Sequence, residues 1–351
     1  MARSEWLRSL GVEEPLILAP MAGGPSTPEL VAAVSNAGGL GSLGAAYQTP
    51  EQLTRDIQRT RELTDKPFGV NLFAGGYKVP AQVDAGPMLA LLSEVHEAYG
   101  LPPPSLPALP SDPFPEQLEA VLEARPAVFS FTFGIPSREV LARLRTRGIA
   151  SVGTATTLEE ARLLVEAGVD AIAAQGAEAG GHRGTFASPF EQALVPILEL
   201  VAGMVRAVSV PVIASGGLMD GRDMAAAMKA GSSAVQLGTA FLTCPESGAS
   251  EAYKRAILAA KQDTTVITRA FSGRPARGLA NTFTSRLQGQ EQLIPPYPLQ
   301  NALTRAMRTA GAKRGESGFL SLWAGQGVAR TRVMPAGELV HLLLEEMRQA
   351  Q

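Results

Sequence analysis

Eight short apolar runs recur along the chain, and segments with helical periodicity separate most of them. They cover residues 16–20, 40–43, 68–73, 127–133, 149–153, 171–175, 211–215 and 234–238. Runs that stay apolar instead of alternating are typical of strands in a parallel sheet that is buried on both faces. Eight such strands alternating with helices predict a TIM (β/α)8 barrel, an α/β fold in which helices surround a closed parallel sheet.

Signals at the helix ends agree with this alternation. Thr49 before Pro50 is a typical helix start, and so is Thr157 with acidic residues in the following turn. Helices predicted to end at the Ala-Gly pairs 37–38, 167–168 and 230–231 each lead directly into a strand. Glycine at such a position adopts the left-handed conformation that ends a helix. The repeated helix-to-strand device supports a chain built of repeated strand–helix units.

Two regions exceed a minimal barrel. Residues 74–115 form a long connection after the third strand, and its proline-dense part at 101–110 favours extended, semi-rigid backbone. We expect this segment to be an insertion that lies over the barrel or forms the edge of a lid. Residues 246–351 follow the eighth strand, and we expect a mostly helical extension that packs on the barrel of residues 1–245.

Composition and charge narrow the possible partners. Hydrophobic residues make up 45% of the 351 residues and charged residues 18%, which suits a large buried core and excludes a disordered chain. Lys and Arg number 31 against 33 Asp and Glu, for a net charge of -2. Because nucleic-acid binders normally carry a basic excess, we expect no nucleic-acid partner.

Metal centres and membrane insertion are also not expected. Cys244 is the single cysteine, and the three histidines are widely separated, so we predict no metal site. The first residues carry charges where a signal peptide needs an apolar run, and Pro196, Glu199 and Arg206 interrupt the apolar stretch 193–208. We therefore expect a cytoplasmic protein without a membrane partner; the sequence does not indicate an oligomeric state.

In a barrel of this kind, active sites form at the carboxyl ends of the strands. Glycine-rich segments follow the seventh and eighth strands, at 215–217 and 236–239. Backbone N–H groups in such loops can converge on a phosphate. The alternative is that these glycines form ordinary tight turns.

Uncharged amides end three of the apolar strands. Asn71, Gln175 and Gln236 could match the donors and acceptors along the pyrimidine edge of a flavin, or could pair with local backbone. The segment 39–44 reads GxGxxG, but a helical pattern precedes it where a dinucleotide-binding fold needs a strand. We interpret these glycines as part of the second strand, where they allow something flat to approach closely.

The loop after the sixth strand carries a histidine and an arginine among glycines, Gly180-Gly-His182-Arg183-Gly. A neutral His182 could accept a proton, and a protonated His182 or Arg183 could hold an anion. His96 and His341 lie in helical stretches and are expected to be structural. No cysteine lies on this loop, so we exclude thiol catalysis there and interpret Cys244 as a buried apolar residue.

Several of these segments together resemble one enzyme family. Residues 18–24, 36–42, 68–71, 175–184, 214–217 and 236–239 are similar to the nitronate monooxygenases, formerly called 2-nitropropane dioxygenases, which are FMN-dependent barrel enzymes. Residues 296–304 and 323–327 resemble the class I branch of that family. The Gly-Gly-His segment is less specific, because FMN-dependent enoyl-acyl-carrier-protein reductases and NADH:quinone reductases have a similar loop.

The resemblance implies a role for each matching residue. His182 is the implied catalytic residue, and substrate contacts are expected at Arg183, Tyr297 and Arg305, the last two on one face if the segment is helical. The implied FMN contacts are Met21, Asn71, Gln175, Gly180, Gly217, Gln236, Leu237, Gly238 and Thr239.

The implied reaction is oxidation of an alkyl nitronate, such as propionate 3-nitronate, by O2 through FMN, giving a carbonyl compound and nitrite. The alternative is an NAD(P)H-dependent flavin reductase that acts on a quinone or an enoyl thioester. A third possibility is a barrel that binds flavin or phosphate without redox turnover, since a barrel fold does not fix a function.

Overall fold

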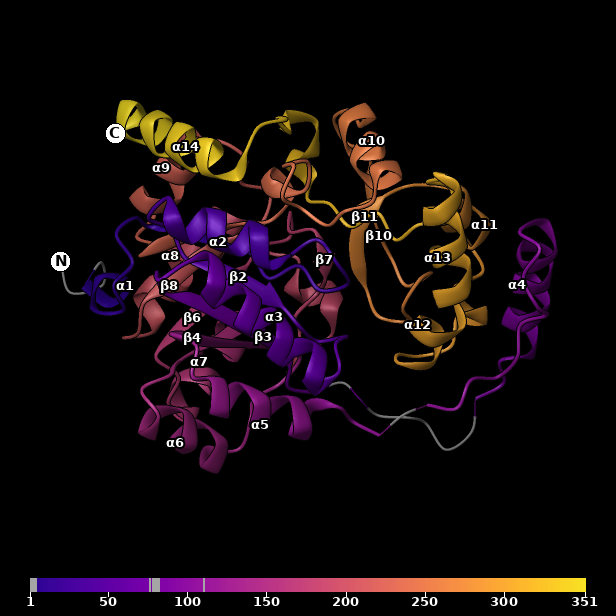
Figure 1. Ribbon diagram of the computed structural model, residues 1–351, viewed down its shortest axis with the longest axis horizontal. Coiled ribbons are helices and arrows are strands. Elements are labelled where there is room, and N and C mark those ends of the chain that lie inside the picture. The colour runs from indigo at the N-terminus through magenta and orange to yellow at the C-terminus, as the bar shows by residue number, and fades with distance from the viewer. Residues whose placement is uncertain (1–4, 76, 78–82, 110) are drawn as a thin grey trace.

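The computed structural model describes residues 5–75, 77, 83–109 and 111–351 (Figure 1). Eight parallel strands among these residues form one sheet, in the order β1-β9-β8-β6-β5-β4-β3-β2. A parallel bridge between Ile17 and Leu40 joins its two ends and closes the barrel. The strands are β1 (Leu16–Leu18), β2 (Gly41–Gly44), β3 (Phe68–Phe73), β4 (Val128–Thr132), β5 (Ala150–Ala155), β6 (Ala171–Gln175), β8 (Val212–Ser215) and β9 (Ala234–Leu237).

The predicted TIM barrel is confirmed. Each predicted apolar run overlaps one of these strands, with ends that differ by no more than about two residues, as is usual for strand boundaries. The continuous apolar character has the expected cause, because β1 and β2 are buried along their whole length.

Eight helices cover the outside of the barrel. Seven follow their strands in sequence, and the eighth, α14, is contributed by the C-terminal residues and packs between α9 and α2 (Figure 1). The helices are α2 (Pro28–Asn36), α3 (Pro50–Leu63), α5 (Phe114–Ala124), α6 (Arg138–Thr146), α7 (Leu158–Ala167), α8 (Ile197–Ala207), α9 (Gly221–Lys229) and α14 (Ala336–Ala350). The helix starts predicted at Thr49 and Thr157 are confirmed, since both side chains accept a capping hydrogen bond.

The amino end of the barrel is closed by a short helix, α1 (Glu5–Ser9). Leu7 of this helix and Val12 of the loop after it are buried against Ile17, Val128 and Ile213, which point into the barrel from three strands. This end is therefore filled by apolar side chains, and the carboxyl end is left for a site.

The extension after β9 contains helices and a small sheet. The helices are α10 (Glu251–Ala259), α11 (Thr282–Arg286), α12 (Leu299–Leu303) and α13 (Arg305–Arg314), in agreement with the prediction of a mostly helical extension. The prediction did not include strands β10 (Thr265–Thr268) and β11 (Ala276–Leu279), which form an antiparallel sheet with β7 (Gly181–His182). This sheet ties the loop after β6 to the extension. The division at residue 245 stays a prediction, since α14 belongs to the barrel's ring of helices.

The insertion after β3 does not lie over the barrel. Its helix α4 (Gly86–Ala98) packs beyond α11–α13, on the side of the extension away from the barrel (Figure 1). The apolar side chains of Met88 and Leu92 are buried there in one cluster with Phe271, Leu303 and Met307. The helix of the insertion lies away from the barrel because α4 buries its apolar face against the extension. The edge of a lid stays a prediction, and Tyr77 near the start of the insertion packs against Tyr297. Residues 76, 78–82 and 110 of the insertion lie outside the described residues.

Candidate active site

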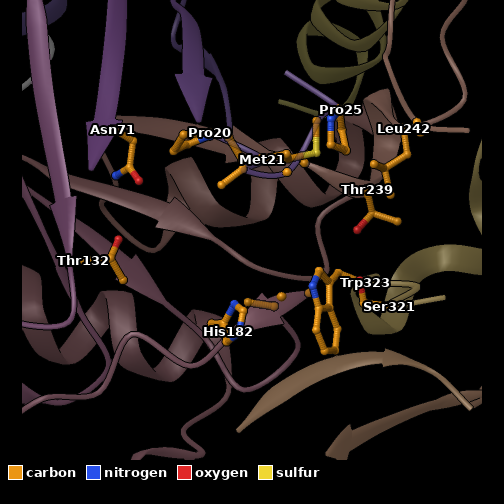
Figure 2. Close-up of a pocket in the computed structure, with 18 of the residues that line it drawn as sticks. Pro20, Met21, Pro25, Asn71, Thr132, His182, Thr239, Leu242, Ser321 and Trp323 are labelled. Carbon is orange, nitrogen blue, oxygen red and sulfur yellow. The ribbon is translucent and has the colours of Figure 1, made fainter. Parts of the chain in front are cut away.

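A cavity of about 570 Å³ opens at the carboxyl ends of the barrel strands. Strand ends, the loop after β6 and the extension all contribute to its wall, and Figure 2 shows His182 and Trp323 facing Met21 across it. Most of the residues predicted for the site line this one cavity. These are Met21, Asn71, Gln175, Gly180, His182, Gly217, Gln236, Leu237, Gly238, Thr239 and Arg305.

The two glycine loops present unpaired N–H groups to the cavity. Gly216 and Gly217 have φ angles of 129° and 71°, which are left-handed conformations that favour glycine. The N–H groups of both, and those of Gly238 and Thr239, have no hydrogen-bond partner among the described residues. A Cβ on Gly217 would also lie 2.6 Å from the Cβ of Glu178. These glycines thus serve close packing and still leave a set of donors suited to an anion.

Two of the three strand-end amides keep an acceptor for the cavity. The Nδ2 of Asn71 donates to Ser130 Oγ at 2.9 Å, and the Nε2 of Gln236 donates to Ser215 Oγ at 3.1 Å. Neither carbonyl oxygen has a hydrogen-bond partner among the described residues. Both amides are therefore fixed in orientation by a serine and can each accept a hydrogen bond from a bound group.

Gln175 uses its amide differently. Its Nε2 donates to the backbone oxygen of His182 at 2.9 Å, and its Oε1 accepts from the N–H of Gly184 at 2.8 Å. The local pairing that we considered as an alternative is therefore what the structure shows for this residue. Gln175 holds the loop that carries His182, and one amide hydrogen is left over.

The glycines of segment 39–44 make room for the protein's own backbone. A Cβ on Gly41 would collide with the backbone of Val31 in α2, and one on Gly44 would lie 2.6 Å from the carbonyl carbon of Met21. Neither glycine lines the cavity. The interpretation that this row of glycines admits a flat ligand was wrong, because the space is taken by a helix and by the loop after β1.

His182 lies in the cavity wall on strand β7. Its Nε2 is 2.8 Å from Ser272 Oγ, and that hydroxyl donates to the backbone oxygen of Arg274 at 3.1 Å. The single hydroxyl hydrogen can be donated to either of these two acceptors, so Ser272 holds the imidazole ring in place and is compatible with both tautomers. Phe133 and Trp323 flank the imidazole, with ring centroids at 5.9 and 5.4 Å.

The surroundings of His182 keep it neutral. Burial, and then the positive charges of Arg274 and Arg308, lower its pKa from 6.5 to about 3. The imidazole is therefore neutral near pH 7 and a weak base, and the alternative of a protonated His182 that holds an anion is not supported.

Arg183 does not reach the cavity. Its side chain is 1% exposed and donates to three backbone oxygens, those of Gly176 at 2.6 Å, Gln175 at 3.1 Å and Ala193 at 3.2 Å. The structure thus assigns Arg183 to holding the loop after β6 and not to the substrate. Cys244 is buried, as expected, and burial raises the pKa of its thiol to about 12.

Tyr297 and Arg305 occupy different surroundings. Arg305 lines the cavity, whereas Tyr297 packs behind its wall against Phe133, with ring centroids 6.4 Å apart. The expected common helical face does not form, because Tyr297 precedes α12 and Arg305 begins the separate helix α13. Proline at position 298 lies between Tyr297 and the first residue of α12.

Several wall residues were not predicted from the sequence. Tyr47 lies just beyond β2, Trp323 lies in the extension, and Asn301 and Arg308 lie on α12 and α13. Asn301 and Trp323 fall in the C-terminal segments 296–304 and 323–327, which carried a signal of their own. No Asp or Glu is among the described residues that line the cavity, so the wall suits anionic ligands.

A model of the nitronate monooxygenase family matches residues 5–346. The chain belongs to the nitronate monooxygenase family. The resemblance seen in the sequence is thus confirmed, and the family is one of flavin-dependent oxidoreductases. None of the helices within the described ranges has the length and apolar character needed to cross a membrane.

Curated nitronate monooxygenase relatives are similar over nearly the whole chain. A probable nitronate monooxygenase of Staphylococcus saprophyticus is 42% identical, with 96% of this chain and 95% of the relative covered. One of Staphylococcus aureus is 41% identical, with 97% and 96% covered.

Solved structures show the same similarity. Nitroalkane oxidase from Streptomyces ansochromogenes superposes with a TM-score of 0.90 at 42% identity, over 98% of both chains. FabK from Thermotoga maritima superposes with a TM-score of 0.78 at 30% identity, over 99% of this chain and 97% of that one.

Proposed function

We propose that this protein oxidises alkyl nitronates with O2, through bound FMN, to a carbonyl compound and nitrite, and that propionate 3-nitronate is a substrate. The observation that carries the proposal is the combination of unpaired backbone N–H groups and a neutral His182 in one cavity without acidic side chains. The family membership and the likeness to a nitroalkane oxidase support it.

The residues of the cavity fit FMN. The N–H groups of Gly216, Gly217, Gly238 and Thr239 would hold its phosphate, since none of these donors has an acceptor within the described ranges of the chain. The free amide oxygens of Asn71 and Gln236 would accept from the ring edge. Of the other predicted contacts, those of Met21, Gly180 and Leu237 would be made by residues that line the same space. When bound, FMN supplies the oxidative chemistry.

The side chains around His182 would bind and orient the substrate. A nitronate is already an anion, so it needs no base, and the donors on Arg305 and Arg308 attract it electrostatically. A neutral nitroalkane must first lose a proton, and the low pKa of His182 makes its imidazole a weak base for that step, so the nitronate is the favoured substrate. Phe133 and Trp323 restrict water around the imidazole.

A reductase that uses NAD(P)H and passes electrons to a quinone or an enoyl thioester is the second candidate. The experiment below therefore also tests for this reductase activity, because the Gly-Gly-His loop resembles that of FMN-dependent reductases and the fold is similar to that of FabK.

The deciding experiment is anaerobic mixing of the flavin-bound protein with propionate 3-nitronate. We expect loss of the oxidised flavin absorbance, and then O2 uptake and nitrite release in air. An unchanged flavin spectrum would contradict the proposal. Rapid bleaching by NADH or NADPH alone would then indicate the reductase. A purified protein that neither contains nor takes up FMN would indicate a binding barrel without redox turnover.

A further inference from the structure

Helices α12 and α13 place an arginine without an acidic partner in the cavity wall. The Nη2 of Arg308 donates to the backbone oxygen of Asn301 at 2.7 Å and to its side-chain Oδ1 at 2.8 Å. Among the residues that the structure describes, no Asp or Glu pairs with Arg308, and burial lowers its pKa to about 10. A buried cation without a counter-ion is costly, and a bound anion would offset that cost.

Asn301 supplies a second donor beside this guanidinium. Its side chain lines the cavity and is 7% exposed. Its Oδ1 is occupied by Arg308, so the amide group that is left is the Nδ2 donor. Neither this Nδ2 nor the Nη1 of Arg308 has a hydrogen-bond partner within the described part of the chain. Both side chains line the cavity, so two adjacent donors are available there to an acceptor on a bound ligand.

The groups around this pair are also donors or cations. Tyr47 lines the same cavity, and its buried hydroxyl has no partner. Arg305 lies three residues before Arg308 and is exposed at the cavity wall. Arg308 acts electrostatically on both Tyr47 and His182, so it lies within range of the reacting region. A ligand with a negative charge can supply the acceptor that this wall lacks among the described residues.

We propose that Arg308 and Asn301 form an oxyanion subsite that takes a planar anion with two oxygens from the substrate. The Nη2 and Nε hydrogens of Arg308 are donated within the protein, to Asn301 and to the backbone oxygen of Thr304. The Nη1 of Arg308 and the Nδ2 of Asn301 are therefore the two donors that can meet two coplanar oxygens. The subsite lies on α12 and α13, apart from the glycine loops of the barrel. Its substrates rest on the proposed function: the anion is either a carboxylate elsewhere on the substrate, as in propionate 3-nitronate, or the nitronate group itself.

Two substitutions test this subsite. Asn301→Asp keeps the acceptor for Arg308 but adds a carboxylate, so the protein's own anion competes with the ligand. Arg308→Lys keeps the positive charge but removes the separate Nη1 and Nη2 groups, so one ammonium cannot hold Asn301 and the anion in the same geometry. Lys313→Gln is the matched control, because it removes a charge from an exposed position of the same helix α13. Circular dichroism and flavin content show whether each variant is folded. If Asn301→Asp does not fold, the result for Arg308→Lys tests the subsite.

The measurements separate binding from turnover. Propionate is titrated into the flavin-bound protein and followed by flavin absorbance and tryptophan fluorescence, since Trp323 lines the cavity. KM is measured for propionate 3-nitronate and for ethyl nitronate, which has no carboxylate. We expect both subsite variants to weaken propionate binding and to raise KM for propionate 3-nitronate by roughly 10- to 100-fold, as for loss of a hydrogen bond to a charged group. Lys313→Gln should change neither.

Each outcome has one meaning. A KM for ethyl nitronate that stays constant assigns the subsite to the carboxylate, and one that rises equally assigns it to the nitronate group. Unchanged propionate binding and unchanged KM values in folded, flavin-containing variants would overturn the subsite. A wild-type protein that oxidises neither nitronate but still binds propionate through Asn301 would overturn the proposed function and leave the subsite standing.

Discussion

At the scale of single residues, unpaired positive charge governs the chemistry of the site. Arg274 and Arg308 both act on His182, and together with burial they keep the imidazole unprotonated at neutral pH. Ser272 holds the ring through a hydrogen bond at Nε2. A neutral histidine beside two arginines leaves the site positively charged, so an anionic substrate is attracted to it.

The depressed pKa of His182 should make the protein sensitive to acid. The folded protein binds the imidazole proton only below about pH 3, whereas the unfolded chain binds it below about pH 6.5. The neutral His182 therefore contributes its full stability to the folded state above pH 6.5, and this contribution is lost as the pH falls toward 3. Between pH 7.5 and 5 this loss amounts to about 2 kcal/mol. Urea unfolding of the flavin-free protein at both pH values measures it.

Substitution of His182 isolates this effect. His182→Asn should lose less stability than the wild type over the same pH interval, and His341→Asn, at an exposed histidine, should behave like the wild type. Equal pH dependence in His182→Asn and the wild type would show that His182 titrates normally in the folded protein.

At the scale of elements, glycines of similar appearance in the sequence do different work. Gly41 and Gly44 let β2 and its following loop approach other backbone, whereas Gly217 and Gly238 face the cavity. The same distinction separates predictable from unpredictable elements. Apolar runs identified the barrel strands, but β7 consists of only Gly181 and His182 and pairs with β11 almost a hundred residues away. No local pattern predicts such a pairing, because tertiary contacts create it.

Helix α14 should be required for the barrel although it comes from the C-terminus. Leu343 is fully buried in the main core, where α14 packs between α9 and α2. Leu343→Ala should lower the free energy of unfolding by about 3 kcal/mol, the usual cost of a cavity in a packed core. His341→Ala, on the exposed face of the same helix, should change it by less than about 0.5 kcal/mol. Chemical denaturation measures both, and similar small effects would mean that α14 is dispensable.

At the scale of the whole molecule, the cavity exists only where barrel and extension meet. The strand-end residues Asn71 and Gln236 could be predicted, because every parallel strand in a barrel ends at the same rim. Arg308 and Tyr47 could not, since nothing in the local sequence shows that α13 of the extension reaches the rim beside β2. Arg183 was predicted beside His182 and follows it in sequence, but its guanidinium turns away from the cavity to donate to backbone oxygens of the loop after β6.

Because both parts contribute to the wall, FMN should stabilise them together. The barrel supplies the glycine loops and the extension supplies Trp323 and Arg308, so a ligand that fills the cavity disfavours separation of the two. FMN at 100 times its dissociation constant should raise the free energy of unfolding by about 2.7 kcal/mol. It should also slow tryptic cleavage within residues 246–335 of the flavin-free protein, whereas cleavage in α6, on the outside of the barrel, serves as the control. If FMN raises the free energy of unfolding but leaves cleavage of the extension unchanged, FMN contacts the barrel alone. The wall formed by α12 and α13 would then bind the substrate instead.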